Sequence, residues 1–266
     1  MKTLTEHPSR LALNAASRTY PDAWRRADDF RGVRGKGKAP DWPAWCFLPL
    51  SGWYAIVCTH ENKSQLDELE TSACAHLAAL GAWRYTQGIY RFHPELFSRL
   101  AATEPGDLPV DTLLRLPEWC VYVDVEGLWD ESVDGFFAFL EFNLRTGQHE
   151  LRIVGLRKEK RSMVTAHPIH LGPWPLTEAL DRAFQEAKKH GQKHSPAKTY
   201  VTEIAPLMQP FLSLLLYLCA GEPDIAGQTP DLYPQHPSPK KVKGGSRLFP
   251  PDKPRIWRIG EVTALD

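Results

Sequence analysis

Apolar residues recur along this chain in two patterns, one typical of helices and one typical of buried strands. Leu66, Leu69, Ala73, Leu77 and Leu80 fall on one helical face and predict a helix over residues 64–80. An equally regular apolar stripe predicts a second helix over 175–190. Residues 203–220 are apolar on nearly every side, which predicts a helix in the centre of the core.

The strongest strand signal is the run 116–125, where β-branched and aromatic residues dominate and Asp124 interrupts the end. The run barely alternates, so we expect a strand that is buried on both faces. A glycine-containing turn at 145–148 separates two further strand-like runs, and residues 117–156 therefore predict an antiparallel meander. Residues 53–59 and 255–260 are predicted as additional strands.

Local signals indicate where several elements begin and end. Ser64 is expected to cap the helix over 64–80, with Asp67 three residues on in a capping-box-like arrangement. Gly81 is expected to end that helix. Pro94 predicts the start of a short helix, and Pro206 and Pro210 fall near the start of the last one.

These patterns together predict an α+β fold. An antiparallel sheet, the meander 117–156 plus flanking strands, is expected to pack against helices near 64–80, 175–190 and 203–220. Residues 1–40 are predicted as a helical N-terminal segment with a basic, glycine-rich loop, and 41–226 as the main α+β domain. Residues 227–266, rich in proline and lysine, are expected to dock back through 255–261.

The composition of the 266 residues is that of an ordinary globular protein, with 42% hydrophobic and 24% charged residues. The formal net charge is zero, so no global field attracts nucleic acid. The five cysteines form no C-x-x-C pair and predict buried, reduced thiols in a cytosolic protein. The N-terminus carries no secretory signal, and no apolar run is long enough to span a bilayer.

Two basic segments are candidates for contact with RNA, the ribosome or another polyanion. Glycine lets a backbone approach phosphates, and Lys and Arg neutralise them, although a solvated linker has the same composition. The residues concerned are Arg31, Arg34, Lys36 and Lys38 in the first segment and Lys240, Lys241 and Lys243 in the second.

Carboxylates, histidines and one cysteine are the candidate catalytic or metal-binding groups of this sequence. Four acids could bind a divalent cation or merely accept hydrogen bonds from backbone N–H groups: Asp124, Glu126, Glu222 and Asp224. The histidine pairs lack neighbouring cysteine ligands: His167 with His170, and His190 with His194. Cys120 lies inside a core strand, where thiols are usually inert. The residues by themselves favour a binding protein over an enzyme, with no cofactor and no metal.

Four blocks in order carry a resemblance to a known family: 80–84 with 88–90, 116–124 (LPEWCVYVD), 216–219 with 222–225, and 256–261. In these residues the sequence resembles the second-described type V-A anti-CRISPR family (Acr VA-two), whose members occur on phages and plasmids. Family members carry a basic, aromatic tail beyond the last block. The chain is expected to be a truncated or shorter member that lacks this tail.

The resemblance implies a cytoplasmic protein of the bacterial host cell that lowers the amount of the type V-A effector nuclease (Cas-twelve-a). Such proteins recognise the N-terminal segment of the nascent nuclease and trigger loss of its mRNA during translation; they are not known as enzymes. Peptide recognition calls for an aromatic groove with a few polar groups that set the register. The expected contacts are Trp83, Arg84, Tyr90, Trp119, Tyr122, Asp124, Glu222 and Asp224.

The aromatic members of this set would equally suit a protein core, whereas Arg84, Asp124, Glu222 and Asp224 are expected to be exposed. Two other functions stay open at this point. One is an RNA-binding protein or metal-dependent ribonuclease. The other is a plasmid maintenance or transfer accessory with no link to CRISPR.

Overall fold

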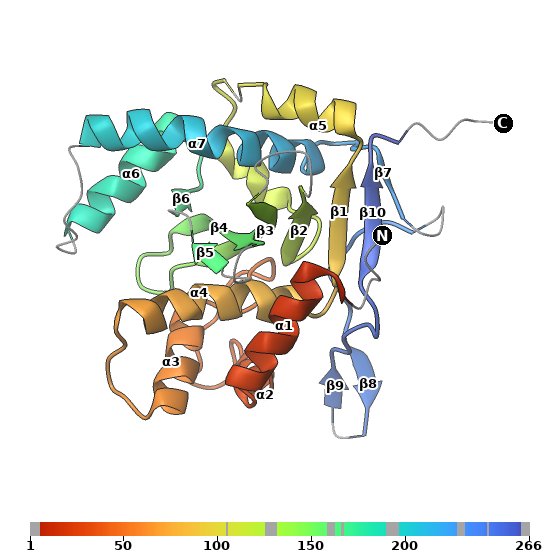
Figure 1. Cartoon of the computed structure of the whole chain (residues 1–266). Helices are drawn as coiled ribbons and strands as arrows, with labels where there is room; N and C mark the ends of the chain where they lie inside the picture. The colour runs from red at the N-terminus through yellow and green to blue at the C-terminus, as the bar shows by residue number, and fades with distance from the viewer. Residues whose placement is uncertain are drawn as a thin grey trace.

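The computed structural model places a mixed β-sheet between two layers of helices (Figure 1). It describes residues 6–104, 106–125, 132–158, 163–165, 168–189, 197–227, 232–243 and 245–261. The helices are α1 (Pro8–Thr19), α2 (Ala23–Gly32), α3 (Leu50–Glu61), α4 (Glu68–Trp83), α5 (Pro94–Ala101), the 3₁₀ helix η2 (Val110–Arg115), α6 (Leu176–Lys189) and α7 (Ala197–Leu218).

The main sheet has eight strands in the order β5-β4-β3-β2-β1-β10-β7, with β6 paired to β4. Its strands are β1 (Gly88–Phe92), β2 (Cys120–Asp124), β3 (Val133–Phe142), β4 (His149–Arg157), β5 (Met163–Thr165), β6 (Ile169–His170), β7 (Ile225–Ala226) and β10 (Arg255–Ile259). A separate two-stranded sheet consists of β8 (Lys240–Val242) and β9 (Gly245–Arg247).

The predicted α+β class and the meander are confirmed, because β2, β3 and β4 pair antiparallel in sequence order. The flanking strand β1 joins them differently, running parallel both to β2 and to β10. Among the described residues, the last strand therefore lies beside the first one, as the blue β10 and the yellow β1 show in Figure 1.

Strand β2 is buried at every position, as its non-alternating sequence predicts. Val121 and Val123 face one core, which α6 and α7 cover, whereas Cys120 and Tyr122 face a second core under α1 to α4. Figure 1 shows these helices above and below the sheet. The N-terminal segment adds Leu13 and Ala27 to the second core.

Residues 53–59 form the middle of helix α3, so the strand predicted there is wrong. The helix begins after Pro49, and the N–H of Leu50 donates hydrogen bonds to both oxygens of Glu141, at 2.9 and 3.0 Å. Trp53, Ile56 and Val57 then lie on one buried face. The carboxylate that satisfies the helix N-terminus comes from β3, far along the chain, and local sequence does not reveal it.

Three expected helix boundaries are also wrong. Helix α4 is capped by Asp67, not Ser64, and Asp67 and Glu70 form a capping box. Gly81 does not end α4 but lies within it, two residues before Trp83. Pro206 and Pro210 lie inside α7, which begins at Ala197.

Gly81 is required where α4 crosses α3. A Cβ atom on Gly81 would lie 2.2 Å from Cη2 of Trp53, whose side chain is fully buried. Glycine is otherwise unfavourable inside a helix by about 1 kcal/mol relative to alanine. Close packing against Trp53 therefore outweighs helix propensity here.

We expect Gly81→Ala to lower the free energy of unfolding by about 1–3 kcal/mol, the usual cost of overpacking a core. Denaturant unfolding measures this loss. Gly32→Ala is the matched control, because a Cβ at that helical glycine meets nothing within 4 Å. The control should be neutral or slightly stabilising. A Gly81→Ala protein as stable as the parent would contradict the close packing.

Candidate functional site

The four sequence blocks singled out above converge on four adjacent strands. They supply β2, β1, β10 and β7, which are neighbours in this order in the main sheet. Within the sheet, Tyr90 lies opposite Val123 on one side and Trp257 on the other, and Ile259 lies opposite Ile225. Residues separated by more than a hundred positions thus build one continuous region.

The four aromatic residues expected at a peptide groove lie in the core. Trp83, Tyr90 and Tyr122 are fully buried, and Trp119 is 5% exposed. The indole N–H of Trp83 donates to the Gly88 carbonyl at 2.8 Å, so its polar atom is satisfied internally. In this arrangement the rings shape the sheet, and the peptide contact expected of them stays a prediction.

The expectation that Arg84 is exposed is wrong, because only 8% of it is accessible. Its guanidinium forms an ion pair with Asp28, donates to the hydroxyl of Tyr85 at 2.8 Å and lies 4.1 Å from the centre of the same ring. Arg84 thereby joins the end of α4 to α2. A buried charge of this kind needs such partners.

The same expectation is wrong for Asp124, which is 7% exposed at the end of β2. Its Oδ2 accepts a hydrogen bond from Nε of Arg91 at 2.6 Å and lies 3.4 Å from Nε2 of His7. Burial raises the pKa of Asp124, but the bonds from His7 and Arg91 outweigh it and hold the pKa below its usual value. The hydroxyl of Ser9 lies 2.8 Å from Nδ1 of His7, and Ser9 is fully buried, so this row of groups is structural.

Beside Tyr90 lies a buried carboxyl, Glu118, which the sequence analysis did not single out. It is 3% exposed, and the side chains of Thr86, Tyr90 and Trp257 surround it. Burial raises the pKa of Glu118 to about 8, although these three polar groups favour the charged form. Glu118 is therefore protonated at neutral pH and neutral inside the sheet region where β1 meets β10.

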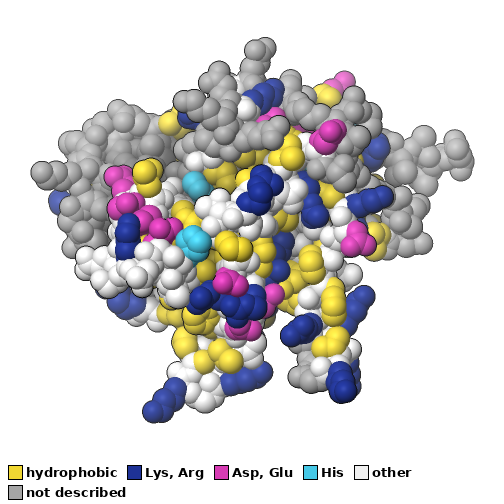
Figure 2. Space-filling view, turned by 60° about the horizontal axis from the view of Figure 1, so that its bottom comes forward, with side chains coloured by type: hydrophobic (Ala, Val, Ile, Leu, Met, Phe, Trp, Pro, Cys, Tyr) yellow, Lys and Arg dark blue, Asp and Glu magenta, His cyan; other side chains and the backbone are white. Residues whose placement is uncertain are grey.

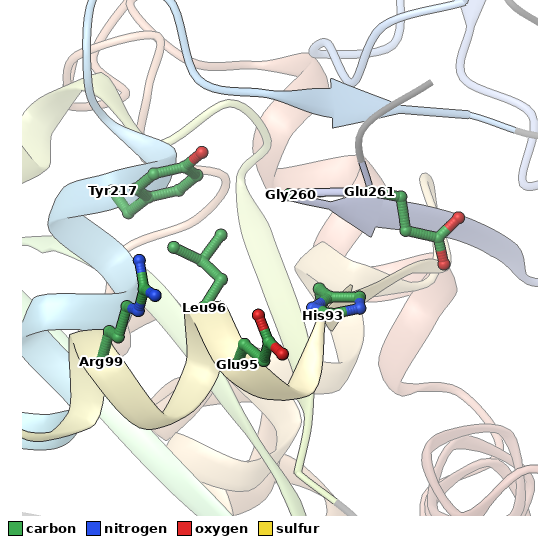
Figure 3. A pocket seen from close by; sticks show the side chains of 7 residues that line it. All are labelled: His93, Glu95, Leu96, Arg99, Tyr217, Gly260 and Glu261. Carbon is green, nitrogen blue, oxygen red and sulfur yellow. The ribbon is translucent and has the colours of Figure 1, made fainter. Parts of the chain in front are cut away.

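A pocket of about 570 Å³ opens where α5, the C-terminal end of α7 and the end of β10 meet (Figure 3). This volume is within the range of roughly 300–1,000 Å³ that is usual for ligand sites. Figure 3 shows Leu96 in its middle, below Tyr217, with charged side chains around. Its lining residues are His93, Glu95, Leu96, Arg99, Tyr217, Gly260 and Glu261.

Gly260 forms one wall of this pocket and ends β10. Its φ of +70° is in the left-handed region, and a Cβ would lie 2.3 Å from Cδ2 of Leu96. Its N–H donates to the carbonyl of Asp224 at 3.0 Å, which ties the loop after α7 to the pocket. Asp224 and Glu222 are both exposed, as expected, and this bond brings their loop to the pocket wall.

Comparison with known proteins identifies the family. A family model described as the anti-CRISPR type V subtype A2 family (AcrVA2-like) matches residues 90–266, more than half of the chain. The chain belongs to this family. Three of the four blocks on the central strands, and the Gly260 wall of the pocket, fall within the matched residues.

The AcrVA2-like fold extends over nearly the whole chain. A crystal structure of AcrVA2 matches with a TM-score of 0.66 and 24% identity, covering 96% of this chain and 84% of that one. Protein FinQ of Escherichia coli is 30% identical over 99 residues, which are 35% of this chain and 29% of FinQ. The match therefore spans less than a third of FinQ.

The basic residues of this AcrVA2-like chain divide into structural and surface groups. Arg31 is structural: its guanidinium donates to the carbonyl oxygens of Cys46 and Phe47 and lies 4.3 Å from the Trp119 ring. Burial, and then the nearby Arg34, lower the pKa of Arg31 to about 10. Arg34 pairs with Asp41 at 3.3 Å, and Lys36 donates to the carbonyl of Gly32 at 2.7 Å.

The remaining predicted cations lie on the surface. Lys38 is exposed in the loop after α2, and Lys240, Lys241 and Lys243 are exposed on or beside β8.

The described part of the AcrVA2-like chain contains no group of three His, Cys, Asp or Glu residues placed to hold a metal ion. Four of the candidate ligands lie outside the described residues: Glu126, His167, His190 and His194. Nε2 of the remaining candidate histidine, His170, lies 3.5 Å from Oε1 of Glu150. Cys120 is fully buried, and burial raises its thiol pKa well above the usual value. None of the described helices has the length and hydropathy that a bilayer-spanning segment requires.

The raised pKa of Glu118 predicts how stability depends on pH. The folded state holds this proton up to about pH 8, whereas the unfolded chain releases it near its ordinary value of 4.5. The contribution of Glu118 to stability is therefore fully present below about pH 4.5 and is lost as the pH rises to about 8. Thermal unfolding between about pH 6.5 and pH 8 should show this decline; at lower pH the half-buried His76, whose pKa burial lowers to about 4, makes stability rise with pH instead.

Glu118→Gln keeps the shape of the neutral acid and should make the decline shallower. Glu141, whose pKa burial also raises to about 8, contributes in the same direction in both proteins and so leaves a residual slope. The difference between the two slopes isolates Glu118. Equal slopes in the parent and the variant would show that Glu118 titrates as an ordinary, accessible carboxyl group.

Proposed function

We propose that this protein is an anti-CRISPR that lowers the level of the type V-A effector nuclease by recognising the N-terminal peptide of the nascent nuclease and triggering loss of its mRNA. Membership in the anti-CRISPR type V subtype A2 family supports the biological class. The peptide and the mRNA steps are our proposal, and the pocket at the end of β10 is the observation that carries it.

The pocket suits a short peptide better than any other place among the predicted contacts. Of the eight residues expected to bind peptide, Glu222 and Asp224 are the exposed ones, and the Asp224 carbonyl is bonded to a pocket residue, Gly260. Leu96 and Tyr217 are partly buried and offer an apolar surface for one anchoring side chain. A peptide-binding site needs this combination of an apolar anchor point and a polar rim.

Acidic groups dominate the rim. Glu95 and Glu261 line the pocket, and Glu222 and Asp224 lie on the adjoining loop, whereas Arg99 is the cation in the lining. The charge of Glu261 is partly neutralised by Arg258, whose Nη1 lies 3.0 Å from Oε2 of Glu261. Because Arg99 and Arg258 balance Glu95 and Glu261, the excess of negative charge comes from Glu222 and Asp224 on the adjoining loop, and it favours a peptide that carries a basic residue next to its apolar anchor.

In this proposal the buried aromatic residues do not touch the peptide; they hold the strands that form the pocket wall in place. Tyr90 lies in β1 two residues before Phe92, whose ring contacts Tyr217 at a centroid distance of 6.1 Å. The strand leads directly into His93 and α5, so its place in the sheet sets one wall of the pocket. Variants at the buried rings are expected to impair the fold before they affect binding.

The first test is a binding titration of the purified protein with a synthetic peptide of the nuclease's first residues. Tyr217→Ala should weaken binding by about tenfold or more, as truncation of an aromatic anchor does. Glu222→Gln should weaken binding by about fivefold through loss of a rim charge. Glu68→Gln, at an exposed position on α4, is the matched control and should bind as the parent does. A folded parent protein that fails to bind the peptide would overturn the recognition step.

The second test measures effector mRNA in cells that express the nuclease. Expression of the parent protein or of Glu68→Gln should lower the mRNA, and Tyr217→Ala should restore it. Constant mRNA in the presence of the parent protein would contradict the proposal and favour a plasmid accessory role. If the parent protein binds the peptide but leaves the mRNA level unchanged, the mRNA step of the proposal is wrong and only the recognition step stands.

A further inference from the structure

The β8–β9 hairpin carries a concentrated positive charge although the whole chain is neutral. Lys240, Lys241, Lys243 and Arg247 are all exposed, and no Asp or Glu occurs from residue 232 to residue 251. Figure 1 shows the hairpin projecting below the main sheet, and Figure 2 shows its Lys and Arg side chains in dark blue at the lower right. The hairpin is therefore a local cationic surface on a neutral protein.

The pairing register of the hairpin places like charges together. Lys240 lies directly opposite Arg247 in the antiparallel pair, so both side chains leave the same face of the ribbon. Like charges in this position destabilise a strand pair. A bound anion between them would relieve this repulsion, so the register favours an anionic ligand.

The base of the hairpin is held firmly on both sides. On the entry side, the centre of the His236 ring lies 5.3 Å from that of Trp119, and the guanidinium of Arg31, in the last turn of α2, lies over the same Trp119 ring. On the exit side, the side-chain amide of Gln87 donates to the Pro251 carbonyl at 2.8 Å. The segments on both sides of the charged tip are thus in contact with the rest of the fold.

Exposed aromatic residues precede and follow the cations in the sequence. Tyr233 is 63% exposed before the hairpin, and Phe249 is 51% exposed after it. Cations alone would fit any polyanion, but cations beside accessible flat rings are the pattern that binds unpaired bases. Bases in a duplex are stacked and unavailable to such rings.

We propose that the β8–β9 hairpin and its flanking rings bind single-stranded RNA, with Lys240, Lys241, Lys243 and Arg247 contacting phosphates and Phe249 stacking on a base. The hairpin comes before β10 in the sequence, and the pocket residues Gly260 and Glu261 come directly after it. The hairpin and the pocket therefore adjoin opposite ends of β10. The inference assigns a second ligand to the protein and holds whether or not the pocket binds the nuclease peptide.

The test measures fluorescence anisotropy of the full-length protein with a labelled, unstructured RNA of about 16 nucleotides, a length that spans known single-strand sites. Lys241→Gln/Lys243→Gln should weaken binding by about tenfold and make the salt dependence of the affinity shallower, because fewer counterions are released. Phe249→Ala should weaken binding by about fivefold with little change in the salt dependence, since a stacking contact carries no charge.

The matched control is Arg157→Gln/Lys188→Gln, which removes two exposed cations from β4 and α6. It should bind RNA as the parent does, and the hairpin variants should keep their affinity for the nuclease peptide. Equal RNA binding by the hairpin variant and this control would overturn the proposal. So would binding of the hairpin to anionic lipid vesicles without measurable RNA binding, or an RNA affinity that Phe249→Ala leaves unchanged.

Discussion

The parallel pairing of β10 with β1 is the interaction on which the rest of this structure depends. It joins residues 255–259 to residues 88–92 along five positions, while β1 is also bonded to β2 on its other edge. The contact is close: a Cβ on Gly88 would lie 2.5 Å from Oε2 of Glu118 and 2.9 Å from Nε1 of Trp257. A parallel pair cannot be joined by a hairpin, so the long intervening segment between residues 92 and 255 has to connect the two strands.

This arrangement explains why both candidate surfaces adjoin the C-terminal strand β10, although α5 supplies much of the pocket lining. Strand β10 leads from the hairpin into the pocket, whose wall it completes at Gly260. Because β10 is held in the sheet by β1 and β7, both surfaces have a rigid support. A peptide at one end and RNA at the other would suit a protein that acts on a message while it is being translated.

Sequence patterns predict secondary structure and burial correctly where a single physical cause, the burial of apolar side chains, determines the local structure. A run such as 120–124 that is apolar without alternation has to be buried on two faces, and the stripe in α6 has to lie on one face of a helix. They were misleading at 53–59, where β-branched and aromatic residues lie in helix α3. The distant carboxylate of Glu141 and the packing of Trp53 on Gly81 stabilise that helix, and neither is visible locally.

The sequence by itself determined the α+β class, the central buried strand, the main helices and the family, because each rests on local periodicity or on ordered blocks of residues. Only the tertiary structure decided which residues are accessible. Trp83, Tyr90 and Tyr122 fit a groove or a core equally well on paper, and Arg84 and Asp124 are polar yet buried through their partners Asp28 and Arg91. Exposure depends on which distant segments meet, and the return of β10 to β1 sets those neighbours.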